Sequence, residues 1–349
     1  MKDLRQSLRN IIQENFIFLD ENNNPVDEED EDSMICKDIL SNNTIYLKTK
    51  KDFSKYKIIS KREEDEFTIY KYSEKERQES QFLTFNYIYD NFNEEDYNTA
   101  YIVLFAGKTG AGKTTAINAF FNIIKGVKLE DNYRYILIEE SLKPKGHAES
   151  QTNGIHLYYL KDYNNKPIII IDTQGYGDVR GTNKDIELNK SFDFVFSNII
   201  SHINTICFIS NSTLNGIDVK TRYIYSCVTS LFADDVSENF ILATHANRDC
   251  MEKGPIFTQS IIKDADFLKI KERIKENTKW WYSFDSKLII YKDKDEIDKL
   301  TKFSYEQLFN FYEEKVKKLM PKNIKKSAEV LKQRYQLRIQ INNLQDYFL

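Results

Sequence analysis

Residues 107–114 read Gly-Lys-Thr-Gly-Ala-Gly-Lys-Thr, which satisfies the pattern G-x-x-x-x-G-K-[ST] of a phosphate-binding loop. An apolar run, Tyr101–Ala106, precedes the loop, and in Thr114–Lys125 after it the apolar residues recur at helical spacing. The sequence therefore predicts a strand, a glycine-rich turn and a helix in succession. In that context the loop amides and the helix N-terminus hold phosphate groups, which argues against a chance glycine-rich turn.

Each residue from Gly107 to Thr115 is a candidate ligand of a nucleoside triphosphate with magnesium. We expect Lys113 to neutralise the β- and γ-phosphates, the Thr114 hydroxyl to coordinate Mg²⁺, and Thr115 to reach the α-phosphate. The full predicted cradle is Gly107, Lys108, Thr109, Gly110, Ala111, Gly112, Lys113, Thr114 and Thr115.

A second motif, Asp172-Thr-Gln-Gly175, ends the buried-strand run Ile168–Ile171. Asp172 can hold the magnesium ion through a water molecule, and the Gly175 amide can sense the γ-phosphate. The polar stretch between the two motifs contains Thr152, the candidate to complete the magnesium shell, with Ser150 as the competing hydroxyl. The DxxG spacing is typical of GTPases and disfavours a P-loop kinase.

The segment that reads the base departs from the guanine pattern N/T-K-x-D. After the strand run Phe240–Ala243 the chain offers Thr244-His245-Ala246-Asn247, and the Asn247 amide supplies one acceptor oxygen where a carboxylate supplies two. Thr244, His245 and Asn247 are the candidate base-binding residues; His245 either stacks on the base or is an ordinary loop histidine. Asp249 replaces the missing carboxylate only if the loop shifts by two residues. GTP is favoured, and ATP or another purine is the alternative.

The residue after Gly175 is Tyr176, where Ras-like enzymes have the glutamine that orients the attacking water. We therefore expect slow intrinsic hydrolysis, accelerated by a second protomer or by Arg180 supplied in trans; otherwise Arg180 is a surface residue of the second switch. The candidate catalytic residues are Lys113, Thr152 and Gly175, and the candidate magnesium ligands are Thr114, Thr152 and Asp172.

Strands alternate with helical segments from residue 100 onward, which predicts an α/β fold with a mainly parallel sheet covered by helices on both faces. The expected strands after the first are Tyr135–Ile138, Ile155–Leu160, Ile168–Ile171, Asn204–Ser210 and Phe240–Thr244. We divide the chain into an α+β N-terminal module (1–98, with an acidic loop at 21–32), a nucleotide-binding domain (99–300) and a helical extension (301–349).

The extension is expected to be helical beyond Ser304 with a break at Pro321. Its apolar residues have heptad-like spacing, which fits either a coiled coil with a partner or a helix packed on its own domain. These residues are Val330, Leu337, Ile341, Leu344 and Phe348. Six lysines give residues 315–326 a basic face, usually a solvated surface and less often a membrane-lipid contact.

Composition limits the other function classes. Lys+Arg 50 against Asp+Glu 54 leaves a formal charge of −4, so no overall basic field predicts nucleic-acid binding. The four cysteines are scattered, which fits a reducing compartment, and no signal-peptide or membrane-spanning run is found in the sequence. We expect a cytoplasmic protein, with peripheral membrane association as an option.

These motifs resemble those of the septins and the immunity-associated GTPases, both in the translation-factor-like class of P-loop GTPases. The resemblance spans roughly Tyr101 to Lys292 and leaves residues 1–98 uncovered. It is carried by Gly107–Thr115, Thr152, Asp172–Asp178 and Arg180–Gly181. It implies a P-loop G domain that binds GTP or GDP with Mg²⁺ and dimerises across its nucleotide face, often near membranes or in scaffolds.

The leading hypothesis is a GTPase switch or assembly scaffold with a low intrinsic rate of hydrolysis. The first alternative is a structural protein that is stabilised by a nucleotide and hardly hydrolyses it. A divergent ATPase is the second, because of Asn247, and an ATP-dependent phosphotransferase is disfavoured by DxxG. The four histidines form no ligand cluster at usable spacing, so a metal-site enzyme is set aside.

Overall fold

The computed structural model describes residues 16–18, 40–41, 44–45, 47–49, 56–62, 67–139, 154–173, 182–210, 219–245, 276, 278–291 and 299–348. The chain divides into two compact units, Met1–Tyr56 and Lys57–Leu349. In the first unit the described strands form two antiparallel pairs, β1 (Phe16–Phe18) with β4 (Leu47–Thr49) and β2 (Leu40–Ser41) with β3 (Thr44–Ile45).

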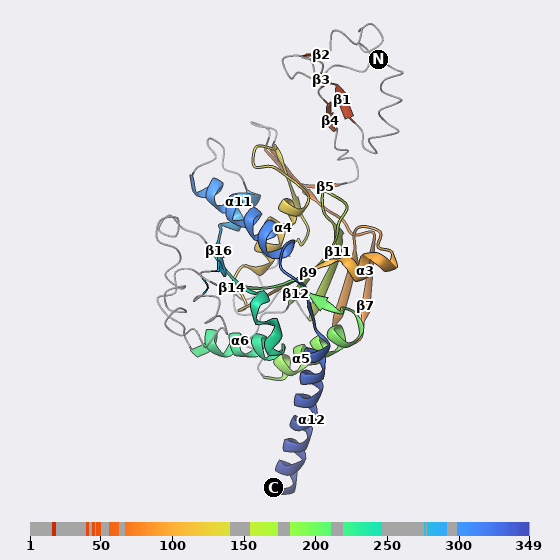
Figure 1. Ribbon diagram of the computed structural model, residues 1–349, viewed down its shortest axis with the longest axis vertical. Coiled ribbons are helices and arrows are strands. Elements are labelled where there is room, and N and C mark those ends of the chain that lie inside the picture. Colours follow the sequence, from red (N-terminus) through yellow and green to blue (C-terminus); the bar gives the residue numbers. More distant parts are fainter. Residues whose placement is uncertain are drawn as a thin grey trace. The chain divides into compact units, whose positions relative to one another are not determined.

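Among the described residues of the second unit, an eight-stranded sheet runs in the order β16-β15-β14-β9-β12-β11-β8-β7 (Figure 1). Neighbouring strands are parallel except in the pairs β11–β12 and β7–β8. The strands are β7 (Glu76–Ser80), β8 (Thr84–Ile88), β9 (Tyr101–Gly107), β11 (Ile155–Lys161), β12 (Pro167–Thr173), β14 (Thr205–Ser210), β15 (Phe240–Thr244) and β16 (Trp281–Ser283).

Helices cover both faces of this sheet, as Figure 1 shows. One face carries α4 (Lys113–Ile124), α10 (Ser286–Ile290) and α11 (Lys299–Phe311), and the other carries α5 (Thr182–Asn198), α6 (Val219–Ser230) and α12 (Lys325–Phe348). The central strand β12 is buried at every position because it has helices on both sides. The predicted α/β class, with a mainly parallel sheet between two helical layers, is confirmed.

A smaller sheet, in the order β10-β6-β5, lies in the same unit. It consists of β5 (Lys57–Arg62), β6 (Phe67–Lys71) and β10 (Tyr133–Ile136). The strand expected at Tyr135–Ile138 therefore lies at 133–136 and belongs to this sheet rather than to the central one. The reason is that Asn122 of α4 binds both backbone groups of Tyr135, at 2.8 Å each, and so occupies one edge of β10.

The expected module boundary near residue 98 also differs from the observed division, which falls between Tyr56 and Lys57. Strand β8 pairs in parallel with β11, and β7 pairs with β8, so both extend the central sheet. This pairing covers an edge that would otherwise leave the β11 backbone groups without partners. The short helix α3 (Glu94–Thr99), capped by Asn93, then leads into β9.

The C-terminal part is mainly helical, as predicted, and is interrupted around Pro321. Helix α11 continues into a π-helical turn, η4 (Tyr312–Val316), and β17 (Lys322–Asn323) then pairs with β13 (His202–Ile203) before α12 begins. The first turns of α12 pack on α5, whereas Leu337 is 57% exposed. The side chains of Ile341, Leu344 and Phe348 lie outside the described residues, so the coiled coil stays a prediction.

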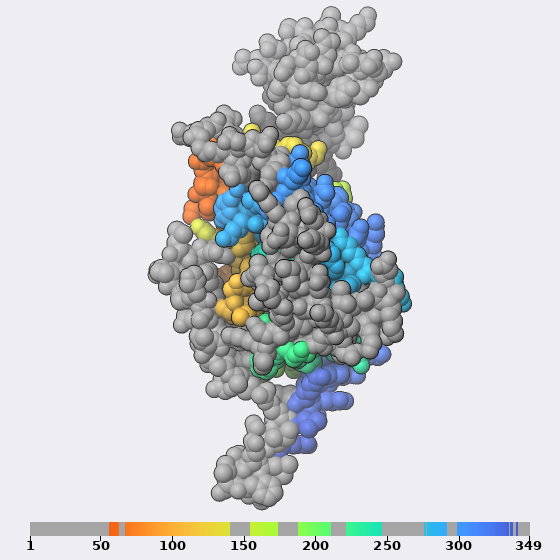
Figure 2. Space-filling model, turned by 90° about the vertical axis from the view of Figure 1, so that its left-hand side faces the viewer, coloured from red at the N-terminus to blue at the C-terminus, as the bar shows by residue number. Residues whose placement is uncertain are grey.

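Arg134 of β10 connects the small sheet to α10, which packs on α4. Its side chain is 1% exposed, and its guanidinium donates hydrogen bonds to the carbonyl oxygens of Ile289 (2.8 Å), Leu129 (3.0 Å) and Asp131 (3.0 Å). The guanidinium also lies over the ring of Phe67 of β6, with its Cζ atom 5.6 Å from the ring centroid. In Figure 2 the orange surface of β5 and β6 lies beside the light-blue segment 278–291.

We predict that Arg134→Met destabilises the protein by about 2–4 kcal/mol, because several buried carbonyl groups lose their donors at once. Urea unfolding of the two proteins measures the difference. The matched control is Lys128→Met at an exposed position of the preceding loop, which should change stability by less than about 0.5 kcal/mol. A wild-type unfolding midpoint for Arg134→Met would contradict the role given to this side chain.

Candidate functional site

The phosphate loop joins the carboxyl end of β9 to the N-terminus of α4, as the sequence predicts. Strand β9 is buried from Ile102 to Gly107, and its neighbours are β12 on one side and β14 on the other. The loop therefore emerges from the middle of the sheet, where ligands of α/β proteins bind. Of the nine residues of the predicted cradle, Gly107 ends β9, and the other eight, 108–115, lie in the turn or in the first turn of α4.

Gly112 precedes α4 in the left-handed region, with a φ of +84°. A Cβ atom built on this residue would lie 2.5 Å from Nε2 of His245, a distance that no real contact allows. The same His245 nitrogen lies 2.8 Å from the carbonyl oxygen of Ala111. His245 is therefore packed against the phosphate loop, so the end of β15 supports the loop directly.

Lys113 is the first residue of α4 and is 8% exposed. Its Nζ donates hydrogen bonds to the carbonyl oxygens of Gly107 (3.3 Å) and Lys108 (3.2 Å). Burial lowers the pKa of this ammonium group, and the negative charge of Asp172 acts in the opposite direction. A buried ammonium held by carbonyl dipoles inside an amide-lined turn is placed to bind phosphate oxygens.

Asp172 stands at the carboxyl end of β12 and is 1% exposed. Its backbone is paired with Phe105 of β9, two residues before the phosphate loop begins, so the carboxylate lies at the same end of the sheet as the loop. Its Oδ1 atom is buried and accepts no hydrogen bond in the part of the chain that the structure describes.

A magnesium ion fits the donors at this end of the sheet. Mg²⁺ prefers oxygen ligands and is usually bound by one or two carboxylates together with phosphate oxygens and water. Asp172 supplies the carboxylate, and Thr114, half-buried in the first turn of α4, supplies a hydroxyl. Thr115 is also half-buried in this turn. Both threonines are therefore where the sequence places them.

Thr244 ends β15 and is 2% exposed. Its hydroxyl donates a hydrogen bond to Oγ of Ser283 on the neighbouring strand β16, at 3.1 Å. The sequence predicts that Thr244 binds the nucleotide, whereas the hydrogen bond of its hydroxyl in the structure is with Ser283. Ser283 was not anticipated, since its strand pairing is not visible in the sequence.

A cavity of about 190 Å³ lies between the phosphate loop, β14 and α6. Lys108 and Thr109 line it from the loop, and Ser210 and Thr221 line it from β14 and α6. Neither of these last two residues, Ser210 and Thr221, is among the site residues predicted from the sequence. Ser210 could have been identified from the sequence, because it is a polar residue at the carboxyl end of an apolar strand, where ligands of α/β proteins bind.

Several predicted site residues lie outside the described residues. These are Ser150, Thr152, Gly175, Tyr176, Arg180 and Asn247. Their roles stay predictions. Within the described ranges, no group of three or more His, Cys, Asp or Glu side chains is arranged to hold a metal ion. No helix in those ranges combines the length and the apolar character needed to cross a membrane.

No protein-family model and no curated protein matches this chain. Among solved structures, it is similar to Toc33 from Arabidopsis thaliana in complex with GDP and Mg²⁺, with 11% identity, 66% of this chain and 93% of that chain covered, and a TM-score of 0.45. A dimerization-deficient mutant of Toc33 gives 12% identity, 68% and 86% coverage and a TM-score of 0.42.

A third structure concerns atToc33 and psToc159, chloroplast translocon components for whose GTPase activity dimerization is important. It gives 14% identity, covers 63% of this chain and 85% of that chain, and has a TM-score of 0.41. Similarity at this level carries no argument about ligand or activity. The chain's own residues therefore carry the functional assignment.

We predict that Gly112→Ala destabilises the protein, because a left-handed alanine costs about 1–2 kcal/mol and its Cβ displaces His245 as well. Urea unfolding measures the loss. The control is the same substitution in a His245→Ala background, which should recover the steric part of the loss and retain the backbone part. Equal stability of Gly112→Ala and the wild type would show that the loop does not hold this conformation.

Proposed function

We propose that this protein binds GTP with Mg²⁺, hydrolyses it slowly, and acts as a nucleotide-controlled switch or assembly scaffold. The observation that carries the proposal is the convergence of Lys113 and Asp172 at one end of the sheet. Lys113 is buried inside the phosphate loop, and Asp172 is buried at the end of the adjacent strand. In a magnesium–triphosphate complex, the Lys113 ammonium would pair with the negative phosphates and the Asp172 carboxylate with the magnesium ion.

The residues of this chain have distinct tasks in that complex. The loop amides and the N-terminus of α4 bind the β-phosphate, and Lys113 neutralises the β- and γ-phosphates. When bound, Mg²⁺ neutralises the charge that develops on the phosphate oxygens. Thr114, Thr152 and Asp172 are the residues that would hold it, and the Gly175 amide would contact the γ-phosphate.

The proposed switch rests on the segments around Thr152 and Gly175. These segments gain contacts when a γ-phosphate is present and lose them after hydrolysis, so the protein has two states that a partner can distinguish. Tyr176 in place of the water-orienting glutamine supports a low intrinsic rate. A second protomer, or Arg180 supplied in trans, would then raise the rate.

Assembly belongs to the same proposal. We infer homodimerisation through the nucleotide face, as the resemblance to septins and immunity-associated GTPases implies, with α12 as a further contact. Localisation is proposed as cytoplasmic, with peripheral membrane association through the basic residues 315–326 as an option. The alternative from a different class is a structural protein that is stabilised by the nucleotide and hardly hydrolyses it.

The test of the proposed function is calorimetric binding of GTP, GDP, ATP and XTP to the purified protein in Mg²⁺. We expect GTP and GDP to bind and Lys113→Ala to abolish GTP binding, because no other buried cation is described in the phosphate loop. The control is Lys128→Ala, an exposed lysine beyond the C-terminus of α4, which should bind like the wild type. If Lys113→Ala binds GTP normally, the loop is not a phosphate site.

Asn247 motivates the second candidate, a divergent ATPase. An asparagine in place of the usual aspartate offers one acceptor oxygen to a base, which weakens discrimination in favour of guanine. In the same titrations, Asn247→Asp should therefore raise the preference for GTP over XTP. A wild-type preference for ATP would overturn the guanine assignment. Turnover measurements then separate an active GTPase from a scaffold that only binds.

A further inference from the structure

The turn that joins β7 to β8 has an unusual backbone. Phe82 and Leu83 both lie in the left-handed region, with φ of +55° and +51°, although neither is a glycine. Side chains with a Cβ rarely adopt this conformation, and two such residues in succession persist only where surrounding contacts hold them.

One set of contacts joins the turn to the start of β11. The amide of Ile155 donates a hydrogen bond to the carbonyl oxygen of Leu83, at 3.0 Å. Gly154 packs so closely there that a Cβ built on it would lie 2.0 Å from the same oxygen. Gly154 follows Thr152 by two residues, so the turn is attached to the end of the first predicted switch segment.

A second set of contacts joins the turn to α5. The hydroxyl of Ser191 donates a hydrogen bond to the carbonyl oxygen of Phe82, and the rings of Phe82 and Phe194 lie 5.9 Å apart. Helix α5 begins seven residues after Gly175 and so follows the second predicted switch segment. The turn therefore contacts both elements that continue from the segments expected to sense the nucleotide.

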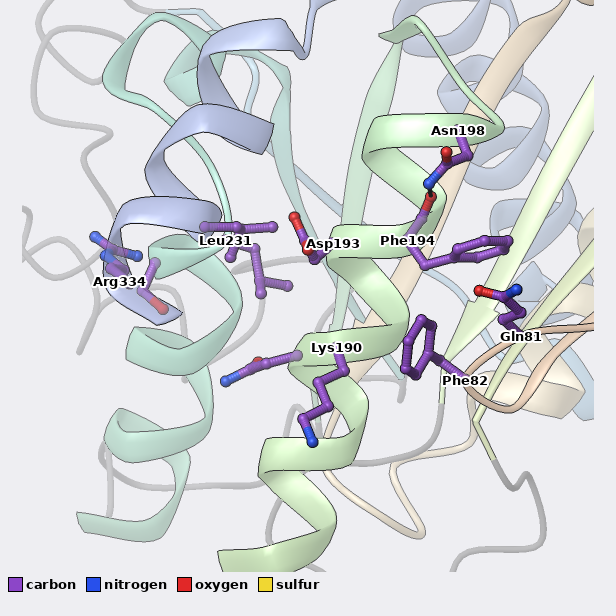
Figure 3. Close-up of a pocket in the computed structure, with 11 residues that line it drawn as sticks. Gln81, Phe82, Lys190, Asp193, Phe194, Asn198, Leu231 and Arg334 are labelled. Carbon is purple, nitrogen blue, oxygen red and sulfur yellow. Dashed lines mark hydrogen bonds between the residues drawn. The ribbon is translucent and has the colours of Figure 1, made fainter. Parts of the chain in front are cut away.

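A surface cavity of about 420 Å³ lies over α5 and includes this turn. Figure 3 shows Phe82 beside Phe194 on one side of α5, and Leu231 and Arg334 on its other side. Phe82 is 53% exposed, so a movement of the turn would change the shape of this surface. Helix α12 contributes Leu331 and Arg334 to the same cavity.

We propose that the β7–β8 turn couples the two switch-linked elements, β11 and α5, and transmits the nucleotide state to the surface around Phe82. The inference rests on the proposed function, because it needs a nucleotide that alters the two segments. The turn is bistable in this account: its left-handed residues stay in place while Ile155 and Ser191 both hold it, and they relax when either contact is lost.

Hydrogen–deuterium exchange of the full-length protein tests the coupling, with GDP or GMPPNP plus Mg²⁺ as the probes. In the wild type, we expect the exchange rates of the 81–90 and 154–161 segments to differ between the two nucleotides by about fivefold, as for one hydrogen bond. Ser191→Ala should abolish that difference and change the ratio of the GDP and GMPPNP dissociation constants by up to about fivefold, since coupling is reciprocal.

The matched control is Ser230→Ala, which lines the same cavity but donates its hydrogen bond within its own helix, to Cys227. Ser230→Ala should leave the difference in exchange rates between the GDP and GMPPNP states unchanged. If Ser191→Ala raises exchange equally with both nucleotides, the contact is structural only and the inference is wrong. If the wild type shows no nucleotide dependence although calorimetry detects binding, the coupling alone fails. If neither nucleotide binds, the proposed function fails as well.

Discussion

The central constraint is the placement of a buried ammonium group at the start of α4, at the same end of the sheet as a buried carboxylate. Lys113 is held inside the phosphate loop by the carbonyl oxygens of Gly107 and Lys108, and the carboxylate of Asp172 is the nearby opposite charge that favours its charged form. Burial of a charge is unfavourable unless polar partners compensate for it. The pairing of β9 with β12 brings the two residues to one end of the sheet, so the sheet topology and the site are linked.

The strands before residue 98 extend this arrangement. Strand β8 pairs with β11, and β6 pairs with β10, so residues from Lys57 onward are part of the unit that carries the site. One result is that the β7–β8 turn lies against Gly154 and Ser191. Contacts made by an N-terminal segment can therefore influence elements that follow the predicted switch segments.

Much of the site could be predicted from the sequence because its signals are local. The phosphate loop, the helix after it and the buried run ending at Asp172 are each contiguous patterns of glycine or apolar residues. The predictions that differ from the structure depend on pairing between distant segments. The hydrogen bonds between Asn122 and the backbone of β10 have no local sequence signature, and neither does the pairing of β8 with β11. The same holds for the hydrogen bond from Thr244 to Ser283.

The most direct test of the central claim is the effect of Mg²⁺ on binding of GMPPNP to the wild type and to Asp172→Asn. We expect Mg²⁺ to raise the affinity of the wild type for GMPPNP, and we expect this gain to be about 10–100-fold smaller in Asp172→Asn. Affinity in EDTA should be similar for the two proteins, because Lys113 and the loop amides remain. An equal gain from Mg²⁺ in both proteins would contradict the claim that Asp172 and the phosphate loop form one site.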